Sequence, residues 1–555
     1  MVHTLVPCPQ AAAGGGAVHV QARSRSWAAR YGAPLPLRRS WRAHAAQAPR
    51  SAPAQRRRRL VRARAATQEA LPTLAIPEGS DLQPTVVMKF GGSSVRDAER
   101  MREVAEIVCS CPCGGDSGAQ GGYLPCLVLS AMGKTTNMLL EAGDAALRCT
   151  SAPEVAEIAA LENIKELHRA TMDELEVDEE TRAEVERLLG GLEQLLVGAM
   201  IMEHLSNRAR DQLVSYGERM STRIFAGYLR RCGIPARQVD AFAAGMVTDD
   251  AFTNADVQYA EALPALRESL SFSPGEQRAV QVVTGFLGRG KNTGAVTTLG
   301  RGGSDLTCTV LGAALGLPEV QVWKDVDGVL TSDPRLVPGA LPVRELTYEE
   351  ATELAYFGAQ VLHPAAMRPA QQTGNMAVRV MNSYNRTAPG TAIRAERDLS
   401  KSLLTSIVLK DDVTIVDVVS SRSLGQVGFL AKVFEVFRQN GISVDMVATS
   451  EVSVSVSLDP AKIWRRPVED HELEDLGREF AEFAEFRVRR GAAIVSLVCN
   501  VQRSSEILQR VFATLFDKGI NAEMISQGSS KTNVSIVIDQ SRAKEAVTAI
   551  HSAFF

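Results

Sequence analysis

The stretch Val86–Ser94 reads VVMKFGGSS and indicates the class of fold. Its first five residues are mostly apolar, which predicts a buried strand over 86–90. Two glycines follow at once, and an apolar helical stripe begins at Val104. A glycine pair lets the backbone approach phosphate oxygens closely, and a following helix directs free N–H groups at an anion. The stretch therefore predicts a strand, an anion-binding turn and a helix, with Lys89 as a mobile positive charge at the strand end. A tight turn with a solvated lysine is the alternative.

Three further apolar runs repeat this strand pattern, at 124–130, 280–284 and 320–324. Helix-favouring stretches separate them, and such alternation predicts an α/β domain with a largely parallel central sheet. Between about 153 and 214 the chain is charged and lacks proline after Pro153, which predicts a helical subdomain within the α/β unit.

The charge of the chain is divided unevenly. Residues 1–68 contain thirteen Arg and no Lys, Asp or Glu, whereas all 555 residues include 61 basic and 64 acidic side chains. Removing the thirteen leaves 48 basic residues against 64 acidic ones, so the formal charge of the remainder is −16. An acidic body argues against nucleic acid as the main partner. No long uncharged apolar run reads as a membrane span.

The basic leader is rich in Ala and free of acids, a composition typical of a transit peptide. The arginine run at 56–59, followed by 61–66, resembles the end of an algal chloroplast presequence. We therefore expect residues 1–66 to be a disordered plastid transit peptide and the mature protein to reside in the chloroplast stroma. A mitochondrial presequence or a disordered nucleic-acid-binding arm is the alternative.

Nine cysteines are spread along the chain, and only Cys109, Cys111 and Cys113 are clustered. No second Cys/His pair lies close in sequence, so the cluster is interpreted as a glycine-rich surface loop with incidental thiols. No residue is predicted to be a metal ligand.

The last third of the chain contains an internal repeat with a spacing of 78 residues. A helical stripe recurs, each stripe is followed by Gly-Ile and then by a Met, and an alternating strand comes next. The pairs are Leu430/Leu508, Val433/Val511, Phe434/Phe512, Phe437/Leu515, Gly441/Gly519, Ile442/Ile520 and Met446/Met524. Two copies of strand–helix–strand–strand predict a pair of small α+β modules.

Two motifs after the first strand suit a polar ligand. The run 130–136 reads SAMGKTT, whose glycine turn and hydroxyls suit phosphate contact, although a P-loop is rejected because Val128 stands where that loop needs glycine. The run 215–221 reads SYGERMS and places Glu218 between a glycine turn and an apolar helix. Glu218 would bind an amino group; a first-turn helix charge is the plainer alternative.

The run 297–305, TTLGRGGSD, is the most unusual stretch. Arg301 stands between glycines, where its planar fork would clamp a carboxylate. Asp305 precedes a small-residue helix predicted over 307–316, and capping that helix is its alternative role. The loops at 323–329 and 331–335 follow a buried strand and could surround a nucleotide, with plain turn chemistry as the alternative.

Together these motifs resemble the aspartate kinases of the amino-acid kinase superfamily. The matching segments, in chain order, are Lys89–Val95, Ser215–Glu218, Thr298–Asp305, Asp325–Gly328 and Phe357–Pro364. In the tail, 428–431, 443–445 and 449–453 resemble the paired ACT modules of these enzymes, and 500–505 and 526–528 resemble the plant monofunctional, lysine-sensitive form. The resemblance implies an amino-acid kinase fold over 84–395, followed by two α+β ferredoxin-like ACT domains over 405–485 and 490–555.

The resemblance also implies roles for individual residues. The nucleotide would be ATP with Mg²⁺, bound by Lys89, Gly91, Gly92, Ser93, Ser130, Asp325, Arg335 and Gln360. Gln360 departs from the bacterial pattern, in which a lysine contacts the nucleotide. The substrate L-aspartate would be bound by Ser130, Glu218, Arg301 and Ser304. The catalytic residues would be Lys89, Arg301 and Asp305.

Regulation and assembly are implied in the same way. L-lysine would bind the first ACT copy at Gln426, Ser443, Asp445, Ser450 and Glu451, with S-adenosylmethionine as a possible second inhibitor. A homodimer through the ACT modules is expected, because isolated ACT sheets expose edges that pairing covers. The competing interpretations are a fused aspartate kinase–homoserine dehydrogenase, a kinase acting on glutamate or acetylglutamate, and an amino-acid-sensing protein on an inactive kinase scaffold.

Overall fold

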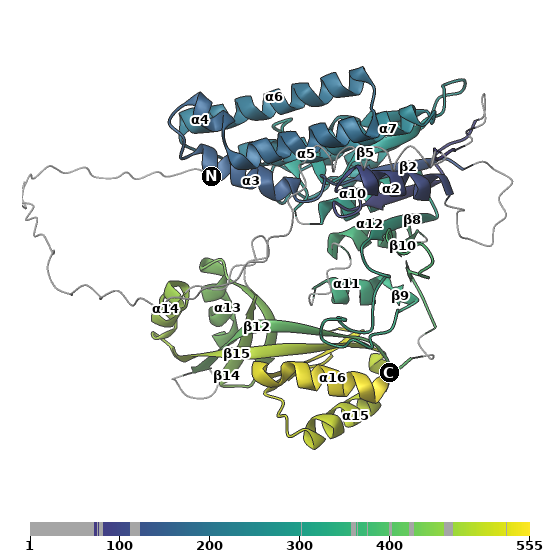
Figure 1. The fold of residues 1–555 in the computed structure, drawn as a ribbon. Coiled ribbons are helices and arrows are strands. Elements are labelled where there is room, and N and C mark those ends of the chain that lie inside the picture. Colours follow the sequence, from purple (N-terminus) through teal and green to yellow (C-terminus); the bar gives the residue numbers. More distant parts are fainter. Residues whose placement is uncertain are drawn as a thin grey trace, which may run out of the picture. The chain divides into compact units, whose positions relative to one another are not determined.

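The computed structural model describes residues 71–74, 76, 81–110, 123–300, 302–356, 362, 364–374, 376–398, 402–420, 427–459, 470–528 and 530–555 (Figure 1). The expected transit peptide, Cys111 and Cys113 lie outside the described residues. In the described part, no helix is both long enough and apolar enough to cross a membrane.

The kinase half is organised around an eight-stranded sheet. Its strands, in spatial order, are β3 (Ala236–Val239), β5 (Val280–Thr284), β2 (Pro125–Leu129), β1 (Val86–Phe90), β8 (Glu319–Lys324), β10 (Ala377–Asn382), β11 (Thr391–Arg394) and β9 (Glu345–Thr347). All neighbours are parallel except β10 and β11. The predicted α/β fold with a largely parallel sheet is confirmed, and each predicted apolar run forms one of its strands.

Side chains alternate between two cores on the two faces of β1. Val86, Met88 and Phe90 lie in one core, and Val87 lies in the other. The first core includes α2 (Ala98–Ser110), α3 (Thr135–Ala146), α5 (Ala159–Leu175), α6 (Glu179–Met202) and α7 (Asn207–Arg231). The second includes α9 (Tyr259–Leu270), α10 (Gly303–Leu315), α11 (Tyr348–Tyr356) and α12 (Met367–Thr373). A strand whose two faces are both covered is expected of a parallel sheet.

The predicted helical subdomain is confirmed as α4 (Ala152–Ala156), α5, α6 and the start of α7. Two side chains set the helix starts, because Asp178 accepts a hydrogen bond from Thr181 N and Ser206 accepts one from Ala209 N. Beside the main sheet lies a three-stranded sheet of β4 (Val247–Thr248), β6 (Leu287–Gly290) and β7 (Val296–Thr298), with the short helix α8 (Ala241–Ala244) before β4.

The C-terminal region forms a second sheet of six strands. Their order is β13 (Ser443–Thr449), β14 (Ser453–Asp459), β12 (Leu404–Ser420), β15 (Ala484–Cys499), β17 (Asn533–Asp539) and β16 (Met524–Ser526). The helices are α13 (Phe429–Gln439), α14 (Asp470–Phe480), α15 (Ser504–Asp517) and α16 (Ala543–Phe554). The two long strands β12 and β15 pair along their whole length, with the register interrupted between Lys410 and Val413.

Each of these two long strands contributes residues to both ACT cores, and we call this arrangement crossed. The first core contains Val416 and Val418 of β12 and Ala484 of β15. The second core contains Leu404 and Ile407 of β12 together with alternate residues of β15, which are Ala493, Val495, Leu497 and Cys499. Each core therefore has four antiparallel strands in ferredoxin-like order, and the first is inserted into the second. This differs from the boundaries expected from sequence, because residues 405–410, expected to open the first module, contribute Ile407 to the core of the second.

The repeat is visible in both cores but is not equally buried. Val433 and Phe437 of α13 are buried, like Val511 and Leu515 of α15. Leu430 and Phe434, predicted to lie on the same buried face, are instead 42% and 37% exposed. The equivalent methionines Met446 and Met524 meet in a small core that the modules share. The modules are therefore related in pattern, while the face of α13 that carries Leu430 and Phe434 stays accessible.

Candidate active site

The strand pattern places two lysines under the same helix. Along β1, Lys89 shares a face with Val87, and along β8, Lys324 shares a face with Val320 and Val322. The two strands are parallel neighbours, so both lysines stand at the carboxyl edge of the sheet. Ligands of open α/β sheets bind at this edge. The helix above this face is α10, which carries Asp305 in its first turn.

Asp305 joins the two lysines in a buried cluster. Lys89 Nζ lies 2.6 Å from Asp305 Oδ1, and Lys324 Nζ lies 3.0 Å from Oδ2. Burial alone would raise the pKa of Asp305, but the charges of Lys89 and Lys324 outweigh it and hold the pKa at about 2. Burial lowers the pKa of Lys324, against the attraction of Asp305. Two ammonium groups held on one carboxylate leave a net positive charge for an anion.

The alternative role of Asp305 as a helix cap is wrong. Helix α10 begins at Gly303, and Gly302 is its N-cap residue, without a side-chain capping bond. Asp305 is the third residue of the helix, and its carboxylate is directed to the two lysines. The sequence prediction began this helix too late because Gly302 and Gly303 were read as part of the loop.

The glycine turn after β1 packs closely against the turn after β2. A Cβ atom at Gly92 would lie 2.8 Å from Ala131 O and 3.1 Å from Gly133 O, so no larger residue fits without a shift. Gly133 N donates to Gly92 O at 3.0 Å. Gly91 lies beside the cluster, since its Cβ would be 3.6 Å from Lys89 Nζ. The two predicted phosphate-binding turns thus form one continuous surface next to the lysines.

Hydroxyl groups connect this surface to α10. Ser130 Oγ donates to Ser304 Oγ at 3.0 Å, and Ser304 is the residue before Asp305. Ser221 Oγ of α7 donates to Ser130 O at 2.8 Å. Three segments far apart in the chain therefore meet within hydrogen-bonding distance, and two of them carry Ser130 and Ser304, which were both expected to bind substrate.

Glu218 lies in the middle of α7 and is buried. Its Oε1 accepts a hydrogen bond from Ala131 N at 3.2 Å, and its Oε2 has no partner in the described part of the chain. Burial raises the pKa of Glu218 to about 8, against the effect of the Ala131 bond. The first-turn alternative is wrong, and Gly217 belongs to the helix rather than to a turn. Its Cβ would lie 2.7 Å from Ala131 Cβ, so glycine allows α7 to approach the second turn.

Asp211 was missed by sequence reasoning although it shapes the site. It lies seven residues before Glu218 on α7 and is buried. Its carboxylate accepts from Thr298 N at 3.0 Å, Thr298 Oγ1 at 2.8 Å and Thr253 N at 2.9 Å. Thr298 ends β7, directly before the loop to α10. Asp211 therefore fixes the start of the loop that leads to Ser304 and Asp305. The spacing of seven residues on one helix face is the signal that could have identified it.

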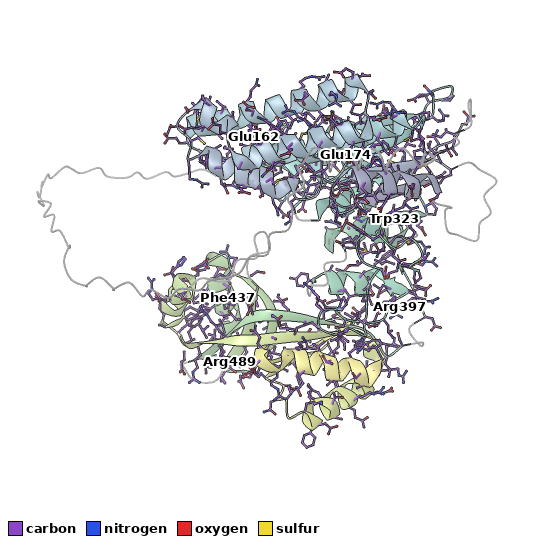
Figure 2. The ribbon with its side chains drawn as sticks, viewed as in Figure 1. Glu162, Glu174, Trp323, Arg397, Phe437 and Arg489 are labelled. Atoms are coloured by element: carbon purple, nitrogen blue, oxygen red, sulfur yellow. The ribbon has the colours of Figure 1, made fainter. Side chains whose placement is uncertain are left out.

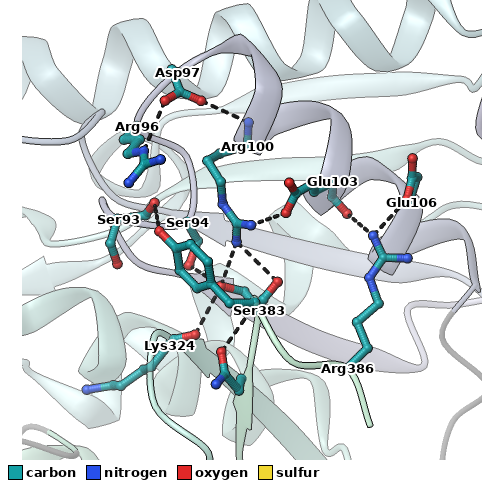
Figure 3. A network of polar contacts seen from close by, with 12 residues as sticks. Ser93, Ser94, Arg96, Asp97, Arg100, Glu103, Glu106, Lys324, Ser383 and Arg386 are labelled. Atoms are coloured by element: carbon teal, nitrogen blue, oxygen red, sulfur yellow. Dashed lines mark hydrogen bonds and ion pairs between the residues drawn. The ribbon is translucent and has the colours of Figure 1, made fainter.

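A polar network ties the first glycine turn to the end of β8 (Figure 3). Ser94 Oγ and Ser383 Oγ lie 2.8 Å apart, and Ser383 Oγ donates to Lys324 O at 3.0 Å. Arg100 of α2 donates to both Ser383 O and Ser383 Oγ at 3.1 Å, and it also pairs with Glu103. Tyr384 Oη donates to Ser93 O at 2.9 Å. The backbone of Lys324 is thereby connected through Ser383 to the first glycine turn and to α2.

Two of the expected nucleotide-binding residues, Asp325 and Arg335, are not part of this cluster. Asp325 is exposed beside Lys324, which it affects electrostatically. The Arg335 side chain is 88% exposed and forms an ion pair with Asp333 at 2.6 Å. Arg301 and Gln360 lie outside the described residues.

The loop after β8 is bonded directly to the C-terminal region. Thr331 Oγ1 and His551 Nε2 of α16 lie 2.8 Å apart, and Ile407 N donates to Thr331 O at 2.8 Å. Ser406 Oγ donates to Leu330 O at 2.9 Å, and Val337 of the loop lies in the second ACT core. Next to it, Arg397 (labelled in Figure 2) donates to the buried carboxylate of Glu350 at 2.7 Å. The loop after β8 and the second ACT core are therefore one bonded unit.

The expected effector residues differ in how they are bound. The Asp445 side chain is 3% exposed and pairs with Lys410 Nζ of β12 at 2.6 Å. Ser450 Oγ lies 2.7 Å from Ser453 Oγ across a turn, Glu451 is exposed, and Ser443 is half-buried. Gln426 lies outside the described residues. Asp445 thus already holds an ammonium group of its own chain.

The donor set of the cluster fits a nucleotide that brings its own metal. Among the described residues, no group of three or more His, Cys, Asp or Glu could hold a metal ion. Asp305, the acid of the cluster, is engaged by two lysines. Mg²⁺ in kinase sites is bound through substrate phosphates, one or two carboxylates and water, so a full protein cage is not required.

Comparison with known proteins agrees with this geometry. The family model described as the amino acid kinase family matches residues 84–382, and a model of the ACT domain matches 416–464 and 495–554. One ACT match falls in each of the two modules. The fold is that of an amino acid kinase with an ACT region attached, and the chain is an ATP-dependent kinase of this class.

The relatives narrow this class. The chain is 53% identical over 498 residues to chloroplastic aspartokinase 1 of Arabidopsis thaliana, covering 90% of this chain and 84% of that protein. It is 34% identical to lysine-sensitive aspartokinase 3 of Escherichia coli, over 85% of this chain and 99% of that protein. The structure of E. coli aspartokinase III in complex with aspartate and ADP matches with a TM-score of 0.70 at 33% identity, over 85% of this chain and 100% of the other. The chain belongs to the aspartokinase family.

Proposed function

We propose that the chain transfers the γ-phosphoryl group of MgATP to the side-chain carboxylate of L-aspartate, giving 4-phospho-L-aspartate and ADP as the first step toward lysine, threonine and methionine. The observation that carries this proposal is the Lys89–Asp305–Lys324 cluster beside two glycine turns. It offers positive charge and backbone N–H groups at a sheet edge where a triphosphate would bind. The solved relative with aspartate and ADP bound supports the same pair of ligands.

The reaction needs no general base, because the side-chain carboxylate of aspartate is ionised at neutral pH. Rate enhancement then rests on in-line positioning and on neutralising charge on the transferred group. Lys89 and Lys324 would stabilise the phosphoryl oxygens, and Asp305 would position both ammonium groups. When bound, Mg²⁺ neutralises part of the charge of the triphosphate.

The amino-acid end of the substrate would be held by Glu218 and Arg301. The buried Glu218 has one unpartnered oxygen, which suits an ammonium group. The role of Arg301 as a clamp for the α-carboxylate rests on the resemblance and on its position between Gly300 and Gly302. Ser130 and Ser304 lie between the amino-acid end and the phosphate end.

An ADP-release assay with aspartate as acceptor tests this function. The wild-type chain should release ADP with aspartate and not with glutamate or acetylglutamate. Lys89→Ala should lower kcat by at least about 100-fold, because one transition-state charge is lost. Lys291→Ala, which removes an exposed lysine paired with Glu261, is the matched control. Lack of aspartate-dependent ADP release by the wild type would favour the alternative, an amino-acid sensor on an inactive kinase scaffold.

We propose that L-lysine inhibits the enzyme at the first ACT module, through Ser443, Asp445, Ser450 and Glu451, with S-adenosylmethionine as a candidate second inhibitor. The lysine-sensitive E. coli relative supports this, as does a solved relative with lysine and aspartate bound, which matches with a TM-score of 0.67 at 33% identity. Glu451→Ala and Ser450→Ala should relieve inhibition while uninhibited turnover stays nearly intact. Unchanged inhibition curves would locate the effector site elsewhere.

Assembly and location follow from the same resemblance. We propose a homodimer through the ACT modules, which sedimentation of the mature chain tests. The acid-free leader and the chloroplastic relatives support import into plastids. N-terminal sequencing of protein from the organelle should find cleavage between about residues 60 and 75, and an intact Met1 or Val2 would contradict import.

A further inference from the structure

A pocket of about 270 Å³ lies between α6 and α7, and none of the residues of the lysine cluster lines it. The pocket is lined by residues of both helices, which are Glu184, Arg187, Leu188 and Gly191 of α6 and Tyr216, Arg219 and Arg223 of α7. The spacings of three and four residues place each set on one helix face, so the pocket is a groove between two facing stripes. The guanidinium groups of three arginines in so small a volume repel one another unless negative charges lie close to them.

One of these arginines is only partly satisfied. The Arg219 guanidinium lies over the Tyr216 ring at 5.4 Å and the Phe242 ring at 5.8 Å. Its Nε is buried and has no hydrogen-bond acceptor in the described part of the chain. Burial, and then the neighbouring charge of Arg223, lower the pKa of Arg219, against the attraction of Asp240. A buried charged donor without an acceptor is unfavourable unless a ligand supplies one.

The charges of the groove leave room for an anion. Arg223 is neutralised, because it pairs with Glu184 at 3.3 Å and with Asp240 at 3.0 Å. Arg187 is exposed and forms no ion pair in the described structure. The two carboxylates therefore offset only part of the charge of three guanidinium groups, and Arg187 and Arg219 remain available. Planar guanidinium groups bind carboxylate and phosphate oxygens with paired N–H donors.

We propose that this groove is a second ligand site, which binds the oxyanion group of a small organic molecule through Arg187 and Arg219. The ring of Tyr216 and the side chain of Leu188 would contact the apolar part of the ligand. Gly191 keeps the groove open, since a Cβ there would already lie 3.0 Å from Tyr216 Oη. Carboxylate and phosphate share the required chemistry, and the experiment below separates them.

The groove is placed to influence the aspartate site. Arg219 follows Glu218 in α7, and Glu218 Oε1 accepts from Ala131 N of the second glycine turn. An anion that shifts Arg219 would therefore alter how Glu218 meets the substrate. This coupling rests on the proposed function, whereas binding to the groove does not. Coupling between two sites is reciprocal, so aspartate would change the affinity for the anion by the same factor.

Calorimetric titration of the full chain, saturated with ADP to occupy the phosphate site of the kinase, tests binding directly. The probes are inorganic phosphate and acetate, at constant ionic strength with chloride. Arg219→Gln should weaken binding of the effective probe at least tenfold, whereas Arg231→Gln, an exposed arginine of the same helix paired with Glu176, should not. Stronger binding of phosphate than of acetate would identify a phosphorylated ligand, and the reverse a carboxylate.

Binding of neither probe, or equal binding by wild type and both variants, overturns the proposal. Thermal unfolding followed by circular dichroism shows whether each variant is folded. Arg219→Lys keeps the positive charge but loses the planar guanidinium group. If folded Arg219→Lys binds the probe as tightly as the wild type does, the proposal is also overturned. KM for aspartate, measured with and without the probe, tests the coupling. If the probe binds to the groove but does not change the KM for aspartate, the second ligand site is supported and the proposed coupling to the aspartate site is refuted. A chain without aspartate-dependent turnover refutes the proposed function and leaves the binding result intact.

Discussion

Thr331 Oγ1 and His551 Nε2 lie 2.8 Å apart, which joins the loop after β8 to the last helix of the chain. Thr331 Oγ1 also accepts from Leu341 N at 2.8 Å, so the hydroxyl hydrogen is free to be donated to the ring. Burial lowers the pKa of His551, so the ring is neutral at physiological pH and its Nε2 can accept that hydrogen. The loop after β8 and the last helix are thus joined by a buried hydrogen bond between side chains.

Breaking this bond should weaken communication between the ACT region and the active site. His551→Phe keeps a ring against Phe555 but leaves the Thr331 hydroxyl without its partner, at a cost of about 1–3 kcal/mol. We expect lysine inhibition to weaken severalfold in His551→Phe and in Thr331→Val, with no further loss in the double variant. Thr548→Val, an exposed site on the same helix, is the control. Additive losses in the double variant would mean that the two residues act separately.

Lys324 should matter for turnover as much as Lys89 does. Both ammonium groups are held on Asp305, and removal of either leaves less charge for the transferred phosphoryl group. We expect Lys324→Met to lower kcat by about 100-fold or more, with a smaller effect on KM for aspartate. Asp305→Asn should lower kcat by misplacing both lysines. Steady-state kinetics decide this, and wild-type kcat in Lys324→Met would remove Lys324 from the site.

Binding of aspartate should release a proton from Glu218. Burial raises the pKa of this carboxyl to about 8, so it is mostly protonated near pH 7 in the free enzyme. A bound ammonium group favours the carboxylate and lowers the pKa. Calorimetry in buffers of different ionisation enthalpy should show release of roughly one proton per aspartate near pH 7, falling to none well above pH 8. Proton release that persists in Glu218→Gln would have another source.

The kinase half should lose stability in mild acid because of His168. Burial lowers the pKa of this histidine to about 4, although Nδ1 donates to Ile164 O at 2.7 Å. The unfolded chain therefore binds one more proton than the folded chain as the pH falls from 6.5 to about 4, and stability drops in this window by about 3 kcal/mol. In His168→Leu, the midpoint temperature of thermal unfolding should depend less on pH between 6.5 and about 4 than in the wild type. The variant His204→Gln, which changes an exposed histidine, should show the wild-type dependence. Equal pH profiles would contradict this account.

Lysine sensitivity should depend on Lys410. In the described structure the Lys410 ammonium occupies the buried carboxylate of Asp445, where an effector ammonium would have to bind. Lys410→Met removes this internal competitor, so we expect inhibition at a lower lysine concentration. Asp445→Asn should relieve inhibition. Activity measured against lysine concentration tests both, with Lys432→Met in the same module as the control. Unchanged curves in Lys410→Met would show that effector and Lys410 do not compete.

Local sequence patterns predicted the sheet and one of the two lysines of the cluster. An apolar run over Val86–Phe90 and the glycine pair after it were enough to single out Lys89, whereas Asp305 was expected in the site only from the family resemblance. Lys324 was missed as a site residue because Asp325 was chosen from the loop that was expected to surround the nucleotide. Side chains alternate between the two faces of a strand, so Lys324 shares a face with Val320 and Val322. This alternation would have placed Lys324 beside Lys89.

Other features depended on contacts that no local pattern contains. Glu218 was expected beside a turn because Gly217 favours one, yet close packing against Ala131 explains that glycine within a helix. Leu430 and Phe434 belong to the predicted apolar stripe of α13. Of the four residues of this stripe, only Val433 and Phe437 are buried. The sequence did not predict that β12 and β15 each contribute to both ACT cores. Apolar and polar residues alternate in both halves of a long strand, so the pattern does not show to which core each half belongs.

The crossed strands also bear on how the chain is made. Leu404–Lys410 leaves the ribosome before the whole first ACT module, yet its partners in β15 and the helices that cover it are among the last residues to be synthesised. The first module can close early, while this short strand keeps an open edge until the C-terminus is free. Such an edge invites pairing with another nascent chain. Translation that ends before α16 would therefore yield aggregates rather than an unregulated enzyme.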